Sequence, residues 1–294
     1  MRRESIGRAV APDAAAAAVE NLGRGHAGLV GIRSVGNKGR VNLLVAPFRA
    51  AIDFALPPRC PACGTIVSGD GAFCQPCWGK LDFLAGAACA ACGLPFELDR
   101  GDDALCAACI ADTPPHDGVR AAVAYGPVAR AVVLKLKHGG RIGMARVIGR
   151  YLARLALVEP NALLVPVPLH RWRIWRRGFN QSVLLGKEVA RRTGLELRSD
   201  LIVRRKRTPM LGGLGRAARA RALRGAFAVP SEMRATLKGR TVLLVDDVYT
   251  SGSTAGACAR VLKRAGAARV IVLCWARVLH DQVDDAAGLG DELG

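Results

Sequence analysis

The chain has 294 residues, of which 51% are hydrophobic and 5% aromatic, and its formal net charge is +19. Its length allows two domains, and its composition is globular, which excludes a disordered or fibrous protein. No stretch approaches the roughly 18 consecutive apolar residues that a membrane-spanning helix needs. The first twenty residues are basic and alanine-rich but lack a continuous apolar core, so we expect no secretory signal and a cytoplasmic location.

The positive charge is concentrated in one region of the chain. Residues 171–224 contain 16 Lys and Arg against 3 Asp and Glu, whereas residues 57–118 contain 3 against 8. A concentrated positive field attracts phosphates or nucleic acid, and a solvated basic surface is the alternative interpretation.

The predicted elements begin after a long extension. Residues 1–40 lack clear periodicity, and we expect a poorly ordered basic extension there. Apolar residues near helical spacing predict a short helix within residues 41–58, which Pro57 and Pro58 end.

Residues 59–112 contain eight cysteines in four C-x-x-C pairs. Two thiolates from one tight turn reach a single metal ion, and two such turns complete a tetrahedral zinc site. The pentapeptides CPACG and CAACG stand 29 residues apart, which indicates a duplicated unit. Without a secretory signal, disulfides are disfavoured, and four pairs exceed what redox catalysis requires. We therefore predict a double zinc ribbon with two structural zinc ions, held by consecutive or interleaved pairs from Cys60, Cys63, Cys74, Cys77, Cys89, Cys92, Cys106 and Cys109.

From residue 116 to residue 280 the pattern alternates between strands and helices. Strands are predicted at 119–125, 162–167, 241–245 and 269–275, and helices at 129–137, 145–157, 181–192 and 253–264. This alternation predicts an α/β domain with a doubly wound parallel sheet, whose ligands bind at the carboxyl ends of the strands. Residues 281–294 form a tail, and the isolated Cys258 and Cys274 are expected to be buried structural residues.

The segment VLLVDDVYTSGST, residues 242–254, places two acids at a predicted strand end, directly before a loop that enters a helix. Backbone amides at the N-terminus of a helix can hold a phosphate group. We therefore predict a phosphate-binding loop formed by Thr250, Ser251, Gly252, Ser253 and Thr254. Asp246 and Asp247 repel phosphate, but carboxylates accept hydrogen bonds from hydroxyl groups. A ribose 5-phosphate satisfies both features, because it carries a diol at one end and a phosphate at the other.

The same segment resembles the phosphoribosyl-pyrophosphate (PRPP) loop of type I phosphoribosyltransferases. Together with CPACG, CWGK, AYGPVARAVVLKLKHGGR (124–141), VPVPLHRWRIWRRGFNQ (165–181) and RGAFAV (224–229), it is similar to the ComF family of bacterial competence proteins. The resemblance implies a double zinc ribbon fused to a type I phosphoribosyltransferase domain. It also implies binding of PRPP with Mg²⁺, a role in handling incoming single-stranded DNA, and a competence helicase as a partner.

By this resemblance, the pyrophosphate loop comprises Val167, Pro168, Leu169, His170 and Arg171, and Arg177 helps to neutralise the anion. Residues 204–224 correspond to a hood over the site. Relatives carry a glutamine and an asparagine in this hood where the chain has Leu211 and Ala222, which leaves turnover and the catalytic residues open. An active phosphoribosyltransferase in base salvage and a zinc-ribbon adaptor without catalysis are the alternatives.

Two smaller features also have two interpretations. His170 either contacts pyrophosphate or has only a structural role. Trp172 and Trp175 alternate with arginines, which favours stacking on exposed bases, or else they belong to a helix that buries one tryptophan.

Overall fold

The computed structural model describes residues 57–138, 142–206 and 216–279. The predicted extension (1–40), most of the predicted short helix (41–58), the predicted tail (281–294) and Leu211 lie outside these ranges. The described residues belong to one compact unit of the chain, residues 52–294. Within them, no helix has the length and apolar character to cross a membrane.

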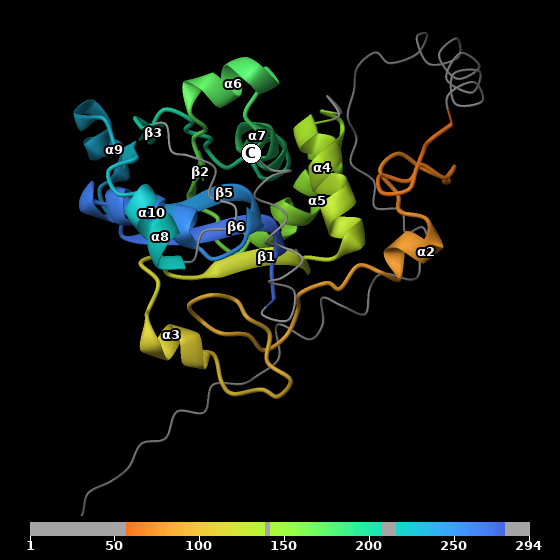
Figure 1. The fold of residues 1–294 in the computed structure, drawn as a ribbon, viewed down its shortest axis with the longest axis horizontal. Coiled ribbons are helices and arrows are strands. Elements are labelled where there is room, and N and C mark those ends of the chain that lie inside the picture. The colour runs from red at the N-terminus through yellow and green to blue at the C-terminus, as the bar shows by residue number, and fades with distance from the viewer. Residues whose placement is uncertain (1–56, 139–141, 207–215, 280–294) are drawn as a thin grey trace, which may run out of the picture. The chain divides into compact units, whose positions relative to one another are not determined.

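Four apolar segments form a parallel sheet in the order β1-β6-β5-β2 (Figure 1). The strands are β1 (Val119–Ala124), β2 (Leu163–Pro166), β5 (Thr241–Tyr249) and β6 (Arg269–Arg277). Central strands β5 and β6 are almost entirely buried, as expected of a parallel sheet that is covered on both faces. The predicted α/β class with a parallel sheet is therefore confirmed.

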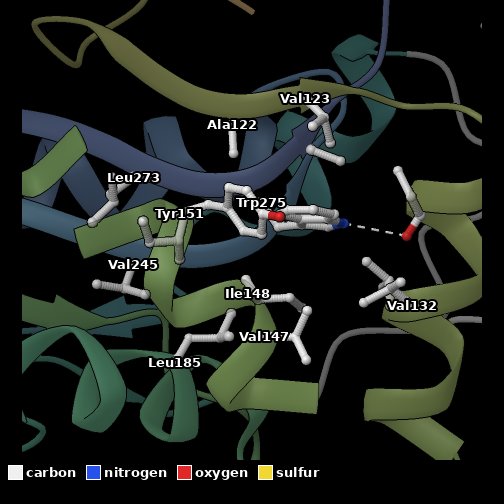
Figure 2. Close-up of a cluster of buried hydrophobic side chains, with 14 of the residues drawn as sticks. Ala122, Val123, Val132, Val147, Ile148, Tyr151, Leu185, Val245, Leu273 and Trp275 are labelled. Atoms are coloured by element: carbon white, nitrogen blue, oxygen red, sulfur yellow. Dashed lines mark hydrogen bonds between the residues drawn. The ribbon is translucent and has the colours of Figure 1, made fainter. Parts of the chain in front are cut away.

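Alternate residues of the central strands pack into two separate cores. Leu243 and Val245 belong to the core beneath α4 (Pro127–His138), α5 (Met144–Ala156) and α7 (Gln181–Thr193). Val242 and Leu244 belong to the opposite core, beneath α10 (Ser253–Arg264). In the first core, Trp275 of β6 packs near Tyr151 and Ile148, and its ring N–H donates to the carbonyl of Ala129 at 3.3 Å (Figure 2). The helices on the two sides thus determine which residues of β5 face each core. The carboxyl end of the same strand carries the two acids.

Short elements connect the strands of the sheet. Helix α6 (Arg171–Arg177) follows β2, and none of its residues is buried. The segment expected to be the hood contains β3 (Val203–Arg204) and α8 (Arg216–Ala222), and β3 pairs antiparallel with β4 (Phe227–Ala228). A 3-10 turn, η3 (Ser231–Met233), and α9 (Arg234–Leu237) lead into β5.

The cysteine-rich segment consists of two similar units. Isolated antiparallel bridges join Arg59 to Ile66 and Ala88 to Pro95. These bridges are offset by the same 29 residues as CPACG and CAACG, since 88 − 59 and 95 − 66 are both 29. Each second C-x-x-C pair opens a short helix, α2 (Gln75–Trp78) or α3 (Ala107–Ala111), with its first cysteine as the N-cap. The units therefore share one local architecture, in agreement with the predicted duplication.

The segment between the two units pairs with the sheet edge. Phe83 bridges antiparallel to Val123 of β1, and the N–H of Leu84 donates to the carbonyl of Ala122 at 3.1 Å. The N–H of Ala124 donates to the carbonyl of Asp82 at 2.8 Å. These backbone bonds cover the free edge of β1.

Strand β5 is longer than the sequence predicts. The prediction ended it at Val245, before the acids, but the strand continues through them to Tyr249. The reason is the neighbouring strand β6, which stays in register with β5 as far as the pair Tyr249–Arg277. The two acids therefore lie within the strand, where a backbone ladder holds them rigidly.

Candidate functional site

The acids of β5 have different partners. Asp247 is buried, and its carboxylate forms an ion pair with Lys137 of α4 at 2.6 Å. Asp246 is partly buried and accepts hydrogen bonds from the backbone N–H of Asp247 at 2.9 Å and from the Ser182 hydroxyl at 3.3 Å. Among the described residues, the hydrogen-bond donors to Asp246 are thus neutral, whereas Asp247 faces a cation.

The pKa values of the two acids are shifted in opposite directions. Burial, and then the charge of Asp247, raise the pKa of Asp246. Burial also disfavours the charged form of Asp247, but the Lys137 ammonium outweighs it and lowers the pKa of that carboxyl. At neutral pH the pair therefore carries about one negative charge, which Lys137 balances.

The loop after β5 turns sharply into α10. Gly252 has φ = 72°, and a side chain there would collide with the Tyr249 hydroxyl. The hydroxyls of Ser251 and Ser253 lie 2.9 Å apart, and an Arg219 guanidinium nitrogen of α8 lies 3.5 Å from the Ser251 hydroxyl. The loop thus gathers hydroxyls, one arginine and the positive end of a twelve-residue helix, a combination that suits an anion.

The loop after β2 begins beside the acid-bearing strand. The N–H of Val167 donates to the carbonyl of Val245 at 2.9 Å, and the Asn180 side-chain amide donates to the carbonyl of Val167 at 3.0 Å. His170 is the N-cap of α6, where its Nδ1 accepts a hydrogen bond from the Trp172 N–H at 3.3 Å. His170 therefore caps α6 through Nδ1, and its contact with pyrophosphate stays a prediction.

Arg177, at the end of α6, completes this side of the site. Partial burial lowers the pKa of its guanidinium, and the negative charge of Asp247 opposes that shift. The adjacent strands β2 and β5 thus bring together the two segments that the sequence singled out, residues 167–171 and 246–254.

Arg219, which contacts the loop, lies in the segment that was predicted to be the hood. Two other residues at this site were missed by the sequence analysis: Lys137 neutralises Asp247, and Ser182 contacts Asp246. Each comes from a different helix, so no spacing along the chain relates it to the acids. The only available signal was the lysine-rich run LKLKHGG, which the resemblance included without assigning a role to it.

The cysteines form two tetrads of consecutive pairs. The first is Cys60, Cys63, Cys74 and Cys77, and the second is Cys89, Cys92, Cys106 and Cys109. In each tetrad all sulfur atoms lie within 4.8 Å of one another, and the Cys63–Cys74 and Cys92–Cys106 distances are 3.5 and 3.7 Å. A tetrahedral zinc ion with bonds of about 2.3 Å requires about 3.8 Å between sulfurs, so both tetrads fit zinc. The pairs are consecutive and not interleaved.

Comparison with known proteins agrees with both parts of this architecture. Residues 51–110 match the double zinc ribbon domain, and residues 180–289 match the phosphoribosyl transferase domain. The chain is thus a protein of the phosphoribosyltransferase fold that also carries a double zinc ribbon.

Individual relatives identify the family within this class. The DNA utilization protein YhgH of Escherichia coli O157:H7 is 32% identical over 215 residues, which cover 69% of this chain and 92% of that protein. Competence protein F of Haemophilus influenzae is 27% identical, with coverage of 69% and 96%, and competence protein ComFC of Bacillus subtilis is 24% identical, with coverage of 69% and 82%. The chain belongs to the ComF family.

Proposed function

We propose that the chain binds a phosphoribosyl ligand, with PRPP as the first candidate. The ribose diol donates to Asp246 and Asp247, and the 5′ phosphate lies in the loop of residues 250–254. The observation that carries this proposal is the direct succession of two carboxylate acceptors and an anion-binding turn at the end of β5. A ligand with only a phosphate group would leave the two acids without a role, and a ligand with only a diol would leave the anion-binding loop without one.

The neighbouring loop supports a pyrophosphate group on the same ligand. Residues 167–171 follow the adjacent strand, and Arg177 supplies a positive charge that interacts with the charge of Asp247. Mg²⁺ enters with PRPP, held by the ligand oxygens and water and not by a dedicated protein cage.

Calorimetric titration of PRPP with Mg²⁺ into the zinc-loaded protein tests this site. We expect binding by the unmodified chain and loss of it in the double variant Asp246→Asn/Asp247→Asn, because amides cannot replace two ionised acceptors. Asp200→Asn, which changes an exposed acid paired with Arg198, is the matched control and should bind normally. A weaker affinity for 2-deoxyribose 5-phosphate than for ribose 5-phosphate should identify the diol contact. Unchanged PRPP binding in the double variant would refute the proposal.

Phosphoribosyl transfer is the second candidate, favoured by the match to the phosphoribosyl transferase domain. The C1′–O bond to pyrophosphate would break while a nucleobase nitrogen bonds to C1′, and pyrophosphate would leave with its charge stabilised by arginines and Mg²⁺. Pyrophosphate release from PRPP against a panel of nucleobases tests this reaction. Release with one base would support an enzyme of base salvage, whereas binding without release with any base would leave PRPP as a ligand only.

We further propose that the chain handles single-stranded DNA. The proposal is motivated by two relatives, one named a DNA utilization protein and the other a competence protein. The acid pair does not suit an interior DNA nucleotide, which lacks a 2′ hydroxyl and has its 3′ oxygen esterified. Helix α6 suits it better, because Trp175 is 82% exposed and Trp172 is 40% exposed, with arginines on either side. DNA bases would therefore contact the two tryptophans of α6, whereas Arg171 and Arg177 at the ends of this helix belong to the proposed pyrophosphate site.

A further inference from the structure

Arg277 is a buried cation that contacts the second cysteine tetrad. It is the last residue of β6 and only 4% exposed. One of its terminal nitrogens donates to the carbonyl of Cys92, and the other donates to the Cys92 sulfur at 3.3 Å. Its backbone carbonyl also accepts a hydrogen bond from the Tyr125 N–H at 2.7 Å, so both ends of the residue are fixed.

No carboxylate among the described residues forms an ion pair with Arg277. A buried guanidinium is costly unless a negative charge compensates it. Four thiolates around one Zn²⁺ carry a net formal charge of −2, and the Cys92 sulfur is one of them. The metal-loaded tetrad is therefore the counterion that this arginine needs, and the N–H···S contact is of the kind that orients metal ligands.

The same guanidinium also contacts the residue that precedes the proposed ligand loop. Its central carbon lies 5.4 Å from the centre of the Tyr249 ring. The Tyr249 hydroxyl lies 3.1 Å from Nε2 of His116, and burial lowers the pKa of this histidine to about 4, so the ring is neutral. Gly252 lies against the same hydroxyl, in the left-handed conformation that lets the backbone approach it. The tyrosine ring thus lies between Arg277, His116 and the turn of the loop.

We propose that Arg277 is a positioning residue that couples the second zinc centre to the loop of residues 250–254. The thiolate charge holds the guanidinium, the guanidinium holds the Tyr249 ring, and the ring supports the turn at Gly252. That this loop holds a ligand rests on the proposed function, but the coupling itself does not require a ligand.

The first tetrad provides an internal comparison. Arg150 of α5 donates to the carbonyl of Gly71, and Lys135 of α4 donates to the carbonyl of Pro61 at 2.9 Å. These bonds attach the first ribbon to helices and not to Tyr249. Arg150→Gln therefore removes an arginine–ribbon contact of similar chemistry without touching the loop.

Amide hydrogen exchange of the zinc-loaded, ligand-free protein tests the coupling. Arg277→Gln should accelerate exchange in a peptide covering residues 249–256 several-fold and should release one of the two zinc ions to a chelator about tenfold faster. Arg277→Lys, which keeps the charge, should retain part of both properties. Arg150→Gln should leave exchange of the loop unchanged. Faster zinc release without a change in loop exchange, or no change in either, would overturn the proposal.

Two cysteine variants, and chelation of the unmodified protein, cover the case in which Arg277→Gln does not fold. Cys63→Ser opens the first tetrad at its exposed ligand, and Cys92→Ser opens the second. Only the second change should raise exchange at residues 249–256, and stepwise chelation of the unmodified chain should raise it as one zinc ion leaves. Equal effects of the two serine variants would contradict the coupling. Because no ligand is added, failure of PRPP binding would not affect this outcome.

Discussion

Asp246 and Asp247 are adjacent in sequence but differ in what compensates their charge. Lys137 stabilises the ionised form of Asp247, while burial and the neighbouring charge favour the protonated form of Asp246. A bound diol donates hydrogen bonds to both carboxylates, which favours the ionised form of each. Ligand binding is therefore linked to the proton on Asp246.

We predict that binding of a phosphoribosyl ligand releases a proton near neutral pH. The pKa of Asp246 is raised in the free protein and should fall in the complex, so the affinity should increase as the pH rises toward the pKa of the free protein. Calorimetry at pH 7.5 in buffers with different ionisation enthalpies measures the released proton, and this pH avoids most of the phosphate titration. Asp246→Asn should abolish the buffer dependence. Proton uptake would contradict the prediction.

The ion pair of Lys137 and Asp247 permits a second prediction at this scale. Both side chains are 6% exposed, so Lys137→Gln leaves a buried carboxylate without its cation and should cost about 3 kcal/mol of unfolding free energy. The cost should be largest at high pH and should decrease as the pH falls, because protonation of Asp247 removes the uncompensated charge. Urea denaturation across this pH range measures the effect.

The matched control is the pair of Lys263 and Asp117, which has the same 2.6 Å separation but side chains that are 36% and 31% exposed. Lys263→Gln should cost less than about 1 kcal/mol, since solvent screens the pair. The double variant Lys137→Gln/Asp247→Asn should recover most of the stability lost in Lys137→Gln. Equal losses at the two pairs would show that burial does not determine their strength.

At the scale of elements, the sequence predicted the helices and strands that have a regular pattern of apolar residues. The helix predicted at 181–192 is α7 (Gln181–Thr193), and it ends at Gly194, whose φ of 75° a glycine adopts easily. The predicted end of β5 was wrong because two adjacent acids are typical of the end of a strand. Only the pairing with β6 shows that the strand continues through Asp246 and Asp247. The C-x-x-C spacing predicted the eight cysteine ligands, but it did not predict which pairs share a metal ion.

A helix at the position of α6 was only one of the two interpretations of its tryptophans. It has seven residues, none of them buried, so it has no apolar stripe that could reveal its period. Its two tryptophans contradict the interpretation in which one is buried, because Trp172 and Trp175 are 40% and 82% exposed. An exposed aromatic pair on a basic helix is the feature on which the proposed DNA surface depends.

We predict that Trp175→Ala weakens binding of single-stranded DNA by roughly 5- to 100-fold, the range expected for loss of one stacked base. Thermal stability should hardly change, because the side chain is 82% exposed. Trp78→Ala removes another exposed tryptophan, from the acidic ribbon segment, and should leave binding unchanged. Fluorescence anisotropy with a labelled oligonucleotide over a range of salt concentrations measures both variants. Equal effects of the two substitutions, or weak binding even at low salt, would contradict a DNA surface on α6.

At the scale of the molecule, the first ribbon shares a core with the sheet. Cys60, Cys77 and Leu81 belong to the same buried cluster as Trp275 and Ile148. The ribbon and the α/β portion therefore do not bury their apolar surfaces independently. Because zinc organises the ribbon, its binding free energy should contribute to the stability of the sheet as well.

We predict that chelation lowers the thermal midpoint of the α/β portion together with that of the ribbons. Near-ultraviolet circular dichroism reports the buried Trp275, and far-ultraviolet circular dichroism reports the helices, so both signals should shift to lower temperature by the same amount when zinc is removed. Readdition of zinc should restore both. An unchanged Trp275 transition after complete zinc removal would show that the sheet folds without the ribbons. A shift of both signals to lower temperature on zinc removal would mean that the shared core couples the ribbons to the sheet, so that metal binding contributes to the fold on which the proposed ligand site depends.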